Sequence, residues 1–428
     1  MATLNYIVFP FHILFTLLSV IGYGLALNKL LKIDADIFSL KNLDFIKGLF
    51  LIGIILGIIN IFFPITNQLT IIVLIMGLII YFILSKHLFK LNEVKFICFV
   101  IIFVLFFAIF AGVNDDFDYH LEIINNYKSQ NLYEIEHSRR ISYNSYWLFL
   151  NSVFTIDYFS STYFTLGSLL YSLSIYDTYK LYKKSIKNRN FYLGISSLFT
   201  LIFLLGILNK YKDFGTDVPG FILSTYVFFV ILYKSFDIKI NYSNDYLLLL
   251  LILTCTAFVF KITNTLIFFY LYIILFNIEF KKINLIKLLF PFIIIFVWFF
   301  QNINISGCLI WPIEITCFIN NELAINERNI IESFAKGDRI TSSKVEGFSW
   351  IKIWFDSHFV KLLETYLVFV LLLLFPVLYL FIKSKKNHTN LNFIKFIDKR
   401  YFLLLGIICI CNFIWFFFTP AYRFGLFY

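Results

Sequence analysis

The sequence predicts an all-α integral membrane protein with about 12 transmembrane helices and two long extracytoplasmic loops. Hydrophobic residues make up 60% of the 428 residues, charged residues only 14%, and the mean hydropathy is +0.83. Soluble domains carry about 25% charged residues. The apolar residues also occur in blocks near the roughly 20 residues that a helix needs to cross a bilayer. We therefore expect a single transmembrane domain over residues 1–428.

The apolar blocks give the expected helices in order. The first block has no Lys or Arg before it and no small-residue cleavage site after it, so we expect a permanent helix rather than a signal peptide. Two late blocks are short and are separated by Lys261, which is typical of a tight hairpin with its turn at the membrane surface. The expected spans run near 7–31, 48–66, 69–85, 96–112, 158–176, 191–208, 219–234, 246–260, 263–278, 288–305, 361–382 and 401–418.

The basic residues orient the predicted bundle. Alternate connections hold 23 of the 36 Lys and Arg residues, and the positive-inside rule makes these connections cytoplasmic. The two long connections, 113–157 and 306–360, then lie on the extracytoplasmic side together with both termini. Because the net charge of +10 is spread over short connections and forms no patch or stripe, we do not expect nucleic-acid binding.

The first long connection opens with an acidic motif, Asn114-Asp-Asp-Phe-Asp-Tyr-His120. It places Asp115, Asp116, Asp118 and His120 where an apolar helix leaves the membrane. Charged groups this close to lipid are costly unless they are solvated, paired or functional. Clustered carboxylates raise one another's pKa, which favours a general base. A solvated loop start explains the same residues, and the spacing is not diagnostic of an Asp/His metal site.

Two arginines follow in the same connection, within Glu136-His-Ser-Arg-Arg-Ile-Ser-Tyr-Asn-Ser-Tyr-Trp147. Arg139 and Arg140 lie outside, against the charge bias of the predicted topology. Guanidinium groups suit bidentate phosphate binding. Neutralisation of the surrounding acidic residues is the alternative explanation.

Three further charged residues lie at predicted helix ends on the same face. Asp217 precedes Pro219 and Gly220 and is expected to cap the following helix. Lys261 and Arg423 each stand beside an apolar block. Such a cation either extends to the lipid headgroups or binds an anion in a cavity.

The second long connection contains a possible disulfide pair and an aromatic stripe. Cys308 and Cys317 can pair if the loop faces an oxidising compartment. Trp350, Ile353 and Trp354 share one helical stripe, which suits a helix lying in the membrane interface. An extension of the next transmembrane helix explains the stripe equally well. The other four cysteines lie in apolar blocks and are expected to be packing residues.

Six short motifs, taken in order, resemble a bacterial family of polytopic proteins in the glycosyltransferase C (GT-C) superfamily. All six fall at the predicted extracytoplasmic face, between residues 115 and 425. They are Asp115-Asp-Phe-Asp-Tyr-His120, Arg139-Arg-Ile-Ser-Tyr-Asn-Ser-Tyr-Trp-Leu148, Asp213-Phe-Gly-Thr-Asp-Val-Pro219, Lys261-Ile-Thr263, Ile305-Ser-Gly-Cys-Leu-Ile-Trp-Pro312 and Pro420-Ala-Tyr-Arg-Phe-Gly425.

The resemblance implies a GT-C-like fold in the bacterial inner membrane. It also implies an inverting transfer of a sugar from a polyprenyl-phosphate-linked donor to a glycan or lipid-linked acceptor outside the cytoplasm. An acidic residue of an early outside loop acts as the base in that superfamily, so Asp115 or Asp116 is the implied base and His120 a nearby orienting group. The implied phosphate ligands are Arg139, Lys212, Lys261 and Arg423. Asp118, Arg140, Asn144, Asp213 and Asp217 are the other substrate-binding candidates in these motifs. A divalent cation is left open as a cofactor.

Two other functions remain as alternatives. A polymerase or ligase of surface polysaccharide would rely on arginines rather than on an acidic cluster. A flippase or transporter would favour charged or helix-breaking residues in mid-membrane and a repeat relating the two halves, and the sequence shows neither. The sequence also lacks a Gly-x-x-x-x-Gly-Lys phosphate loop and a Gly-x-Ser-x-Gly elbow, so ATP-driven transport and serine-hydrolase chemistry have no support.

Overall fold

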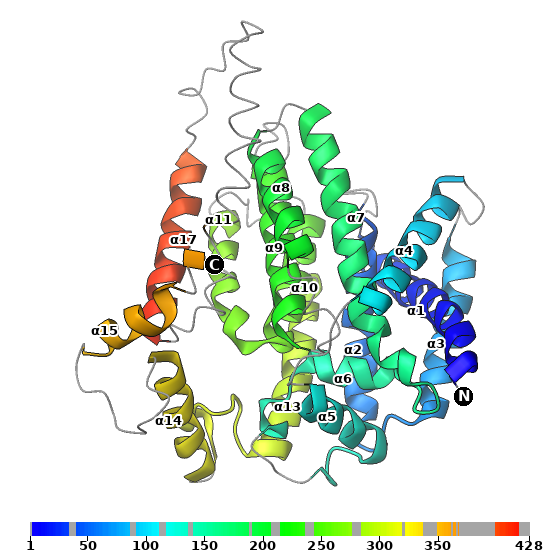
Figure 1. The fold of residues 1–428 in the computed structure, drawn as a ribbon, viewed down its shortest axis with the longest axis horizontal. Coiled ribbons are helices and arrows are strands. Elements are labelled where there is room, and N and C mark those ends of the chain that lie inside the picture. Colours follow the sequence, from blue (N-terminus) through cyan, green and yellow to red (C-terminus); the bar gives the residue numbers. More distant parts are fainter. Residues whose placement is uncertain are drawn as a thin grey trace, which may run out of the picture.

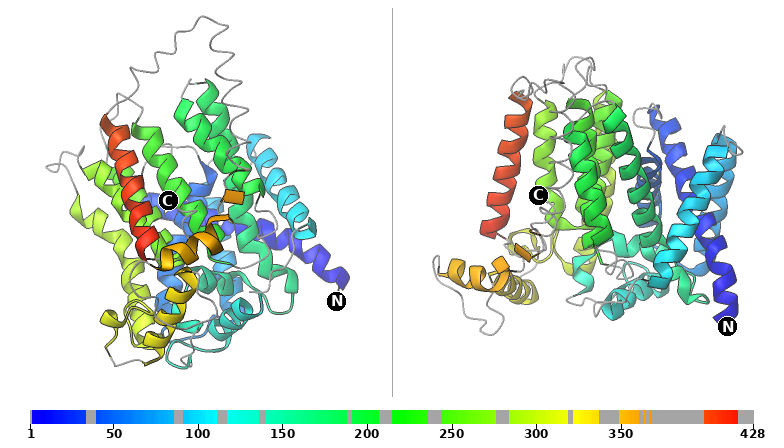
Figure 2. Two further views of the ribbon diagram at one scale, coloured as in Figure 1. Left: turned by 60° about the vertical axis from the view of Figure 1, so that its left-hand side comes forward. Right: turned by 45° about the horizontal axis from the view of Figure 1, so that its top comes forward.

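The described part of the protein is a bundle of helices with further short helices across one end (Figures 1 and 2). A computed structural model describes residues 2–33, 40–85, 91–110, 117–135, 140–187, 191–206, 215–235, 244–275, 284–318, 322–336, 349–360, 363–364, 367 and 399–418. In these ranges the only β-type pairing is an isolated bridge between Cys308 and Cys317. The expectation of an all-helical protein is therefore confirmed for the described residues.

The first four helices are α1 (Ala2–Leu31), α2 (Lys41–Ile59), α3 (Asn67–Leu84) and α4 (Leu91–Phe110). Glycines allow α1 to approach its neighbours closely. A Cβ atom at Gly48 of α2 would lie 1.9 Å from the Val20 carbonyl oxygen, and one at Gly22 would lie 2.2 Å from the Gly77 carbonyl oxygen. Small residues at such crossings are typical of helix packing within membranes.

The start of α2 is polar yet buried, because α7 (Thr165–Lys187) supplies its cap. The Asn42 and Lys41 backbone N–H groups donate to the Asp177 carboxylate at 2.8 and 3.3 Å. A carboxylate suits this position, since the first amides of a helix have no partner within the helix. The predicted span 48–66 was therefore misplaced, because α2 begins at Lys41 and ends at Ile59.

The middle of the chain forms α5 (Phe117–Ser129), η1 (Ile141–Tyr143), α6 (Tyr146–Phe154) and η2 (Ser160–Phe164) before α7. The predicted span 158–176 began too early, because residues 160–164 form the separate 3₁₀ turn η2. The Thr162 hydroxyl closes that segment by donating to the carbonyl oxygens of Ile156 and Phe159 at 3.1 and 2.7 Å. The upright helices α8 (Phe191–Gly206), α9 (Asp217–Ser235) and α10 (Asn244–Phe260) follow.

The last part contains η4 (Ile262–Ile267), α11 (Phe268–Leu275), α12 (Leu285–Leu289), η6 (Phe290–Phe292) and α13 (Ile293–Ser306). After η7 (Glu314–Thr316) come α14 (Glu322–Lys336), α15 (Trp350–Trp354), the π-helical turn η8 (Phe355–Phe359) and α17 (Lys399–Phe418). The predicted span 361–382 lies almost wholly outside the described residues.

Four helical segments of the described chain are long and apolar enough to cross a membrane. They are Val8–Leu31, Lys41–Ile59, Asn67–Leu84 and Leu285–Ser306. Five shorter apolar helices accompany them: Leu193–Gly206, Asp217–Ile231, Asp245–Phe260, Ile262–Leu271 and Gly406–Phe417. The apolar helices indicate a protein of the lipid bilayer, while the total of about 12 spans stays a prediction.

Candidate functional site

The two long connections meet at one end of the bundle. α5 and α6 from the first connection, and α14 and α15 from the second, lie at the same end, across the upright helices (Figure 2). We call this the loop end. α9 begins and α10 finishes there, so Asp217 and Lys261 lie at the loop end as well (Figure 1).

Residues 140–145, which we call the junction segment, connect the two loops through Asn144. Asn144 is buried and adopts a left-handed backbone with φ of 38°, a conformation that Asn tolerates better than most residues. Its side-chain oxygen accepts a hydrogen bond from the Tyr127 hydroxyl at 2.5 Å, and its Nδ2 donates to Asn302 Oδ1 at 2.8 Å. Trp298 Nε1 donates to the Asn144 carbonyl oxygen at 2.7 Å. Asn144, a predicted substrate ligand, thus uses both side-chain polar atoms to join α5 and α13.

Two neighbours of Asn144 extend these connections. The Tyr143 hydroxyl donates to Glu327 Oε1 of α14 at 2.5 Å, and the Glu327 side chain is buried. The Ser145 hydroxyl donates to the Phe260 carbonyl oxygen at 2.8 Å. The junction segment is therefore attached to α14 and to the end of α10.

Tyr146, which follows the junction segment, fixes it to α2. Its hydroxyl donates to the Gly53 carbonyl oxygen at 2.7 Å. A Cβ atom at Gly57 would lie 2.0 Å from that hydroxyl oxygen, so only glycine leaves room for the tyrosine at this position.

The structure brings two of the predicted charged residues into contact. Lys261 Nζ forms an ion pair with Asp217 Oδ1, and the lysine side chain is mostly buried. Close packing of α9 on η4 continues at Gly220, where a Cβ atom would approach Asn264 Nδ2 to 2.9 Å. Because Lys261 directly follows Phe260, the Asp217–Lys261 pair adjoins the junction segment.

His120 lies near the start of α5 and is buried. Burial, and secondarily the positive charge of Arg140, lower the pKa of His120 from 6.5 to about 4. The imidazole is therefore neutral near pH 7. The Arg140 guanidinium is exposed and lies 4.8 Å from the ring centre of Tyr119, in a cation–π contact.

α5 is held in place by a buried lysine. Lys128 Nζ donates to the Thr155 carbonyl oxygen at 2.6 Å and to Asn67 Oδ1 at 2.8 Å, and it lies 3.2 Å from Asp157 Oδ1. Burial lowers the pKa of Lys128, and the Asp157 carboxylate opposes that shift. These contacts fix the helix that carries His120 to α6 and α3.

Several predicted site residues lie outside the described part of the chain. Asp118 belongs to α5, but its side chain is not among those described. The residues outside the described ranges are Asp115, Asp116, Arg139, Lys212, Asp213 and Arg423. Among the described residues, no group of three or more His, Cys, Asp or Glu side chains is placed to hold a metal ion.

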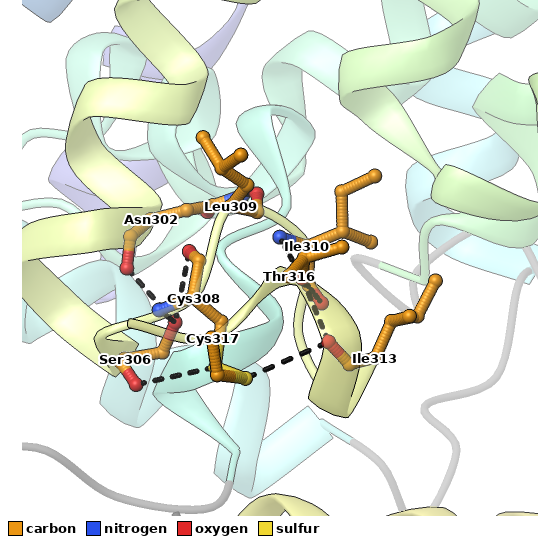
Figure 3. The surroundings of a disulfide bond; sticks show 8 residues. All are labelled: Asn302, Ser306, Cys308, Leu309, Ile310, Ile313, Thr316 and Cys317. Carbon is orange, nitrogen blue, oxygen red and sulfur yellow. Dashed lines mark hydrogen bonds between the residues drawn. A yellow bond between two sulfur atoms is a disulfide. The ribbon is translucent and has the colours of Figure 1, made fainter. Parts of the chain in front are cut away.

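The predicted pairing of Cys308 with Cys317 is confirmed (Figure 3). The disulfide closes a turn that we call the disulfide turn, residues 308–318. Inside it, the Leu309 N–H donates to the Thr316 carbonyl oxygen at 2.9 Å. Asn302 Nδ2 donates to the Leu309 carbonyl oxygen at 2.8 Å. Since Asn302 also bonds Asn144, the disulfide turn is connected to the junction segment.

The aromatic stripe of the second loop packs against α17. Trp350 and Trp354 are buried together with Trp415 in one apolar cluster. α15 lies across the end of α17 (Figures 1 and 2), and η8 follows it directly. The other four cysteines divide into two groups, Cys255 and Cys411 being buried and Cys98 and Cys409 exposed.

The sequence analysis did not single out Tyr127, Asn302, Trp298 or Glu327. Their partners are more than 15 residues distant along the chain, so no local spacing relates them. One signal was present for Glu327. It lies three residues after Ala324 in a segment with an amphipathic period, which places it on the apolar face of α14.

Over the described residues, fold and composition together define an all-helical protein with helices long and apolar enough to span a membrane. The chain belongs to the family described as "Domain of unknown function (DUF8201)", whose sequence profile matches residues 6–428. No curated protein and no solved structure matches the chain.

Proposed function

We propose that this protein is a membrane glycosyltransferase of GT-C type with about 12 transmembrane helices. In the proposal it transfers a sugar from a polyprenyl-phosphate-linked donor to a glycan or lipid-linked acceptor. The loop end faces the extracytoplasmic side of a bacterial inner membrane. The basis is the motif resemblance together with the placement of the described motif residues.

One observation carries the proposal. Segments far apart in the sequence come together at the loop end, through the Ser145–Phe260 hydrogen bond and the Asp217–Lys261 ion pair. The motifs beginning at Arg139, Asp213 and Lys261 thereby adjoin one another. A cation from one motif and an exposed guanidinium from another, Lys261 and Arg140, provide the positive charge that a phosphate leaving group requires.

The proposed chemistry needs one base and a stabilised leaving group. The carboxylate of Asp115 or Asp116 takes the proton from the acceptor hydroxyl. The hydroxyl oxygen then forms a bond to the anomeric carbon, and the bond between that carbon and the phosphate oxygen breaks. The electron pair of the broken bond leaves with the polyprenyl phosphate, whose negative charge is offset by nearby cations.

His120 and Asp217 have supporting roles in this scheme. A neutral imidazole can donate or accept a hydrogen bond without adding positive charge, which suits orientation of an acceptor hydroxyl. Asp217 holds the Lys261 ammonium at the loop end before a phosphate arrives. When donor binds, the lysine shares its positive charge between the two anions.

The test measures product formed from a polyprenyl-phosphate sugar by purified protein in proteoliposomes. Asp115→Asn and Asp116→Asn keep size and hydrogen bonding while removing the proton acceptor. General-base contributions are about 10²- to 10⁴-fold in rate, so one of the two variants should lose nearly all activity. Arg423→Ala should weaken donor binding, because its proposed partner is the phosphate.

Asp245→Asn is the matched control, since Asp245 lies in the first turn of α10, at the opposite end from Lys261. It should retain wild-type activity at matched expression. Full activity in both Asp115→Asn and Asp116→Asn would reject the base assignment. Loss confined to arginine variants would instead favour a polymerase or ligase that joins lipid-linked glycans.

A further inference from the structure

The disulfide turn presents apolar side chains to the outside of the molecule. Ile315 is 93% exposed, Phe318 67% and Ile313 44%. Leu323, near the start of the neighbouring α14, is 52% exposed. Isolated exposed apolar residues are ordinary on a protein surface, whereas a cluster of this kind marks an interaction site.

The exposed cluster continues a stripe on the preceding helix. Spacings of three and four residues put the exposed apolar residues of α12 and α13 on one helical face: Leu289, Ile293, Phe296, Phe300 and Ile303. They belong to the segment Leu285–Ser306, one of the four long enough to cross a membrane. We therefore take this stripe to face lipid, and the exposed residues of the disulfide turn follow it along the chain.

Helix length places the turn at the edge of the bilayer. A helix of 22 residues is about 33 Å long at 1.5 Å per residue, and the hydrocarbon core is about 30 Å thick. Ser306 thus lies near the boundary between hydrocarbon and headgroups. Gly307, with φ of 70°, ends the helix there.

The turn cannot extend far from this boundary. The Phe318 N–H donates to the Gly307 carbonyl oxygen at 2.9 Å, and the disulfide joins Cys308 to Cys317, so the turn closes on the end of α13 (Figure 3). The only charged residue in the turn is Glu314. Its carboxylate lies 3.8 Å from the Arg328 guanidinium of α14, which offsets that charge.

We propose that the disulfide turn is a membrane-surface anchor. Ile313, Ile315 and Phe318 enter the boundary between lipid headgroups and acyl chains at the loop end. The disulfide keeps these side chains presented together, and the anchor fixes the height of the second loop relative to the bilayer. This assignment does not depend on the glycosyltransferase proposal, because it rests only on exposure, chain continuity and helix length.

The experiment places a nitroxide spin label at residue 315 through Ile315→Cys. The four free cysteines are replaced, and thiol counting verifies that the native disulfide is retained. The protein is reconstituted in phosphatidylcholine–phosphatidylglycerol vesicles. The relaxation rate of the spin label is measured in the presence of oxygen, which concentrates in lipid, and of a water-soluble nickel complex. At residue 315 oxygen should increase this rate several-fold more than the nickel complex does.

Two matched label positions calibrate the result. Phe296→Cys reports the lipid-facing stripe of α13, and Glu122→Cys reports the exposed surface of α5. Nickel access at residue 315 equal to that at residue 122 would overturn the proposal. Low access to both reagents, with spin–spin broadening that disappears on dilution with unlabelled protein, would overturn it too, because the occupant would be a second copy of the chain.

A second measurement avoids new cysteines. A photoreactive p-benzoylphenylalanine at residue 315 should crosslink to phospholipid in the same vesicles, as detected by mass spectrometry of the labelled peptide. p-Benzoylphenylalanine at position 122 should give no lipid adduct. Absence of a lipid adduct at residue 315, with efficient crosslinking at residue 296, would contradict membrane contact by the turn.

Discussion

The Tyr143 hydroxyl lies 2.5 Å from the carboxylate of Glu327, and this contact joins the two long connections at the loop end. The two residues are 184 positions apart. Glu327 is buried on α14, while Tyr143 belongs to the junction segment. The position of α14 and the conformation of the junction segment therefore depend on one another.

Tyr143→Phe removes the donor and leaves a buried carboxylate with one hydrogen bond fewer. A buried acceptor that loses its partner costs about 1–3 kcal/mol, so the free energy of unfolding in detergent should fall by that amount. Glu327→Gln should lower the free energy of unfolding by less in the Tyr143→Phe background than in the wild-type protein, because the bond between the two residues is already lost. Tyr133→Phe is the control, since Tyr133 is exposed. Additive effects of the two changes would show that the contact contributes nothing.

Gly57→Ala should destabilise the protein by about 1–3 kcal/mol, the usual cost of forcing an extra methyl group into a packed interior. The new Cβ atom would meet the Tyr146 hydroxyl oxygen at 2.0 Å. Tyr146→Phe removes that oxygen and should recover part of the loss in thermal unfolding. Gly406→Ala has no atom within 4 Å of its Cβ position, so this control should be neutral or slightly stabilising. A Gly57→Ala protein as stable as wild type would contradict the observed packing.

His120 makes stability depend on pH in a defined direction. Its pKa is about 4 in the folded protein and 6.5 in the unfolded chain. The folded state therefore binds the proton less readily, and the contribution of His120 is complete above pH 6.5. The contribution decreases as the pH falls from 6.5 to 4 and is lost below that window. The loss is at most about 3.5 kcal/mol, since one pKa unit corresponds to about 1.4 kcal/mol. His120→Asn should flatten the acid limb of the unfolding profile across this window. If the difference in free energy of unfolding between wild type and variant were the same at pH 7 and at pH 4, this would argue against the lowered pKa of His120.

The predicted orientation is tested by reporter fusions. Fusions after residues 130 and 340 should report an extracytoplasmic location, and fusions near residues 185 and 390 a cytoplasmic one, because the basic connections stay inside. A cytoplasmic reporter at residue 130 would move the whole loop end to the other side of the membrane. The glycosyltransferase proposal would then fail with it.

The sequence allowed good prediction of helices that are apolar along their whole length. The predicted spans 69–85 and 246–260 lie within two residues of α3 and α10, because continuous apolar blocks leave little choice of structure in lipid. The start of α2 was missed for a specific reason. Lys41 and Asn42 look like loop residues until Asp177, 135 positions after Asn42, is placed beside them.

Prediction of the candidate site was less complete. Asp217 and Lys261 were both singled out, but their ion pair depends on how α9 and α10 pack. α5 and α6 were not predicted as helices, because α5 is largely polar and both helices, at 13 and 9 residues, are too short to suggest a span. The predicted base residues Asp115 and Asp116 lie outside the described residues, so their role stays a prediction.

The carboxylate cap of α2 has a consequence for biosynthesis. Asp177 is made 135 residues after Asn42, and a ribosome adds about 5–20 residues per second. For roughly 7 to 27 seconds the first turn of α2 has water or lipid headgroups as partners in place of its final carboxylate. The cap of α2, and with it this contact between α2 and α7, is therefore completed only after α7 has left the ribosome.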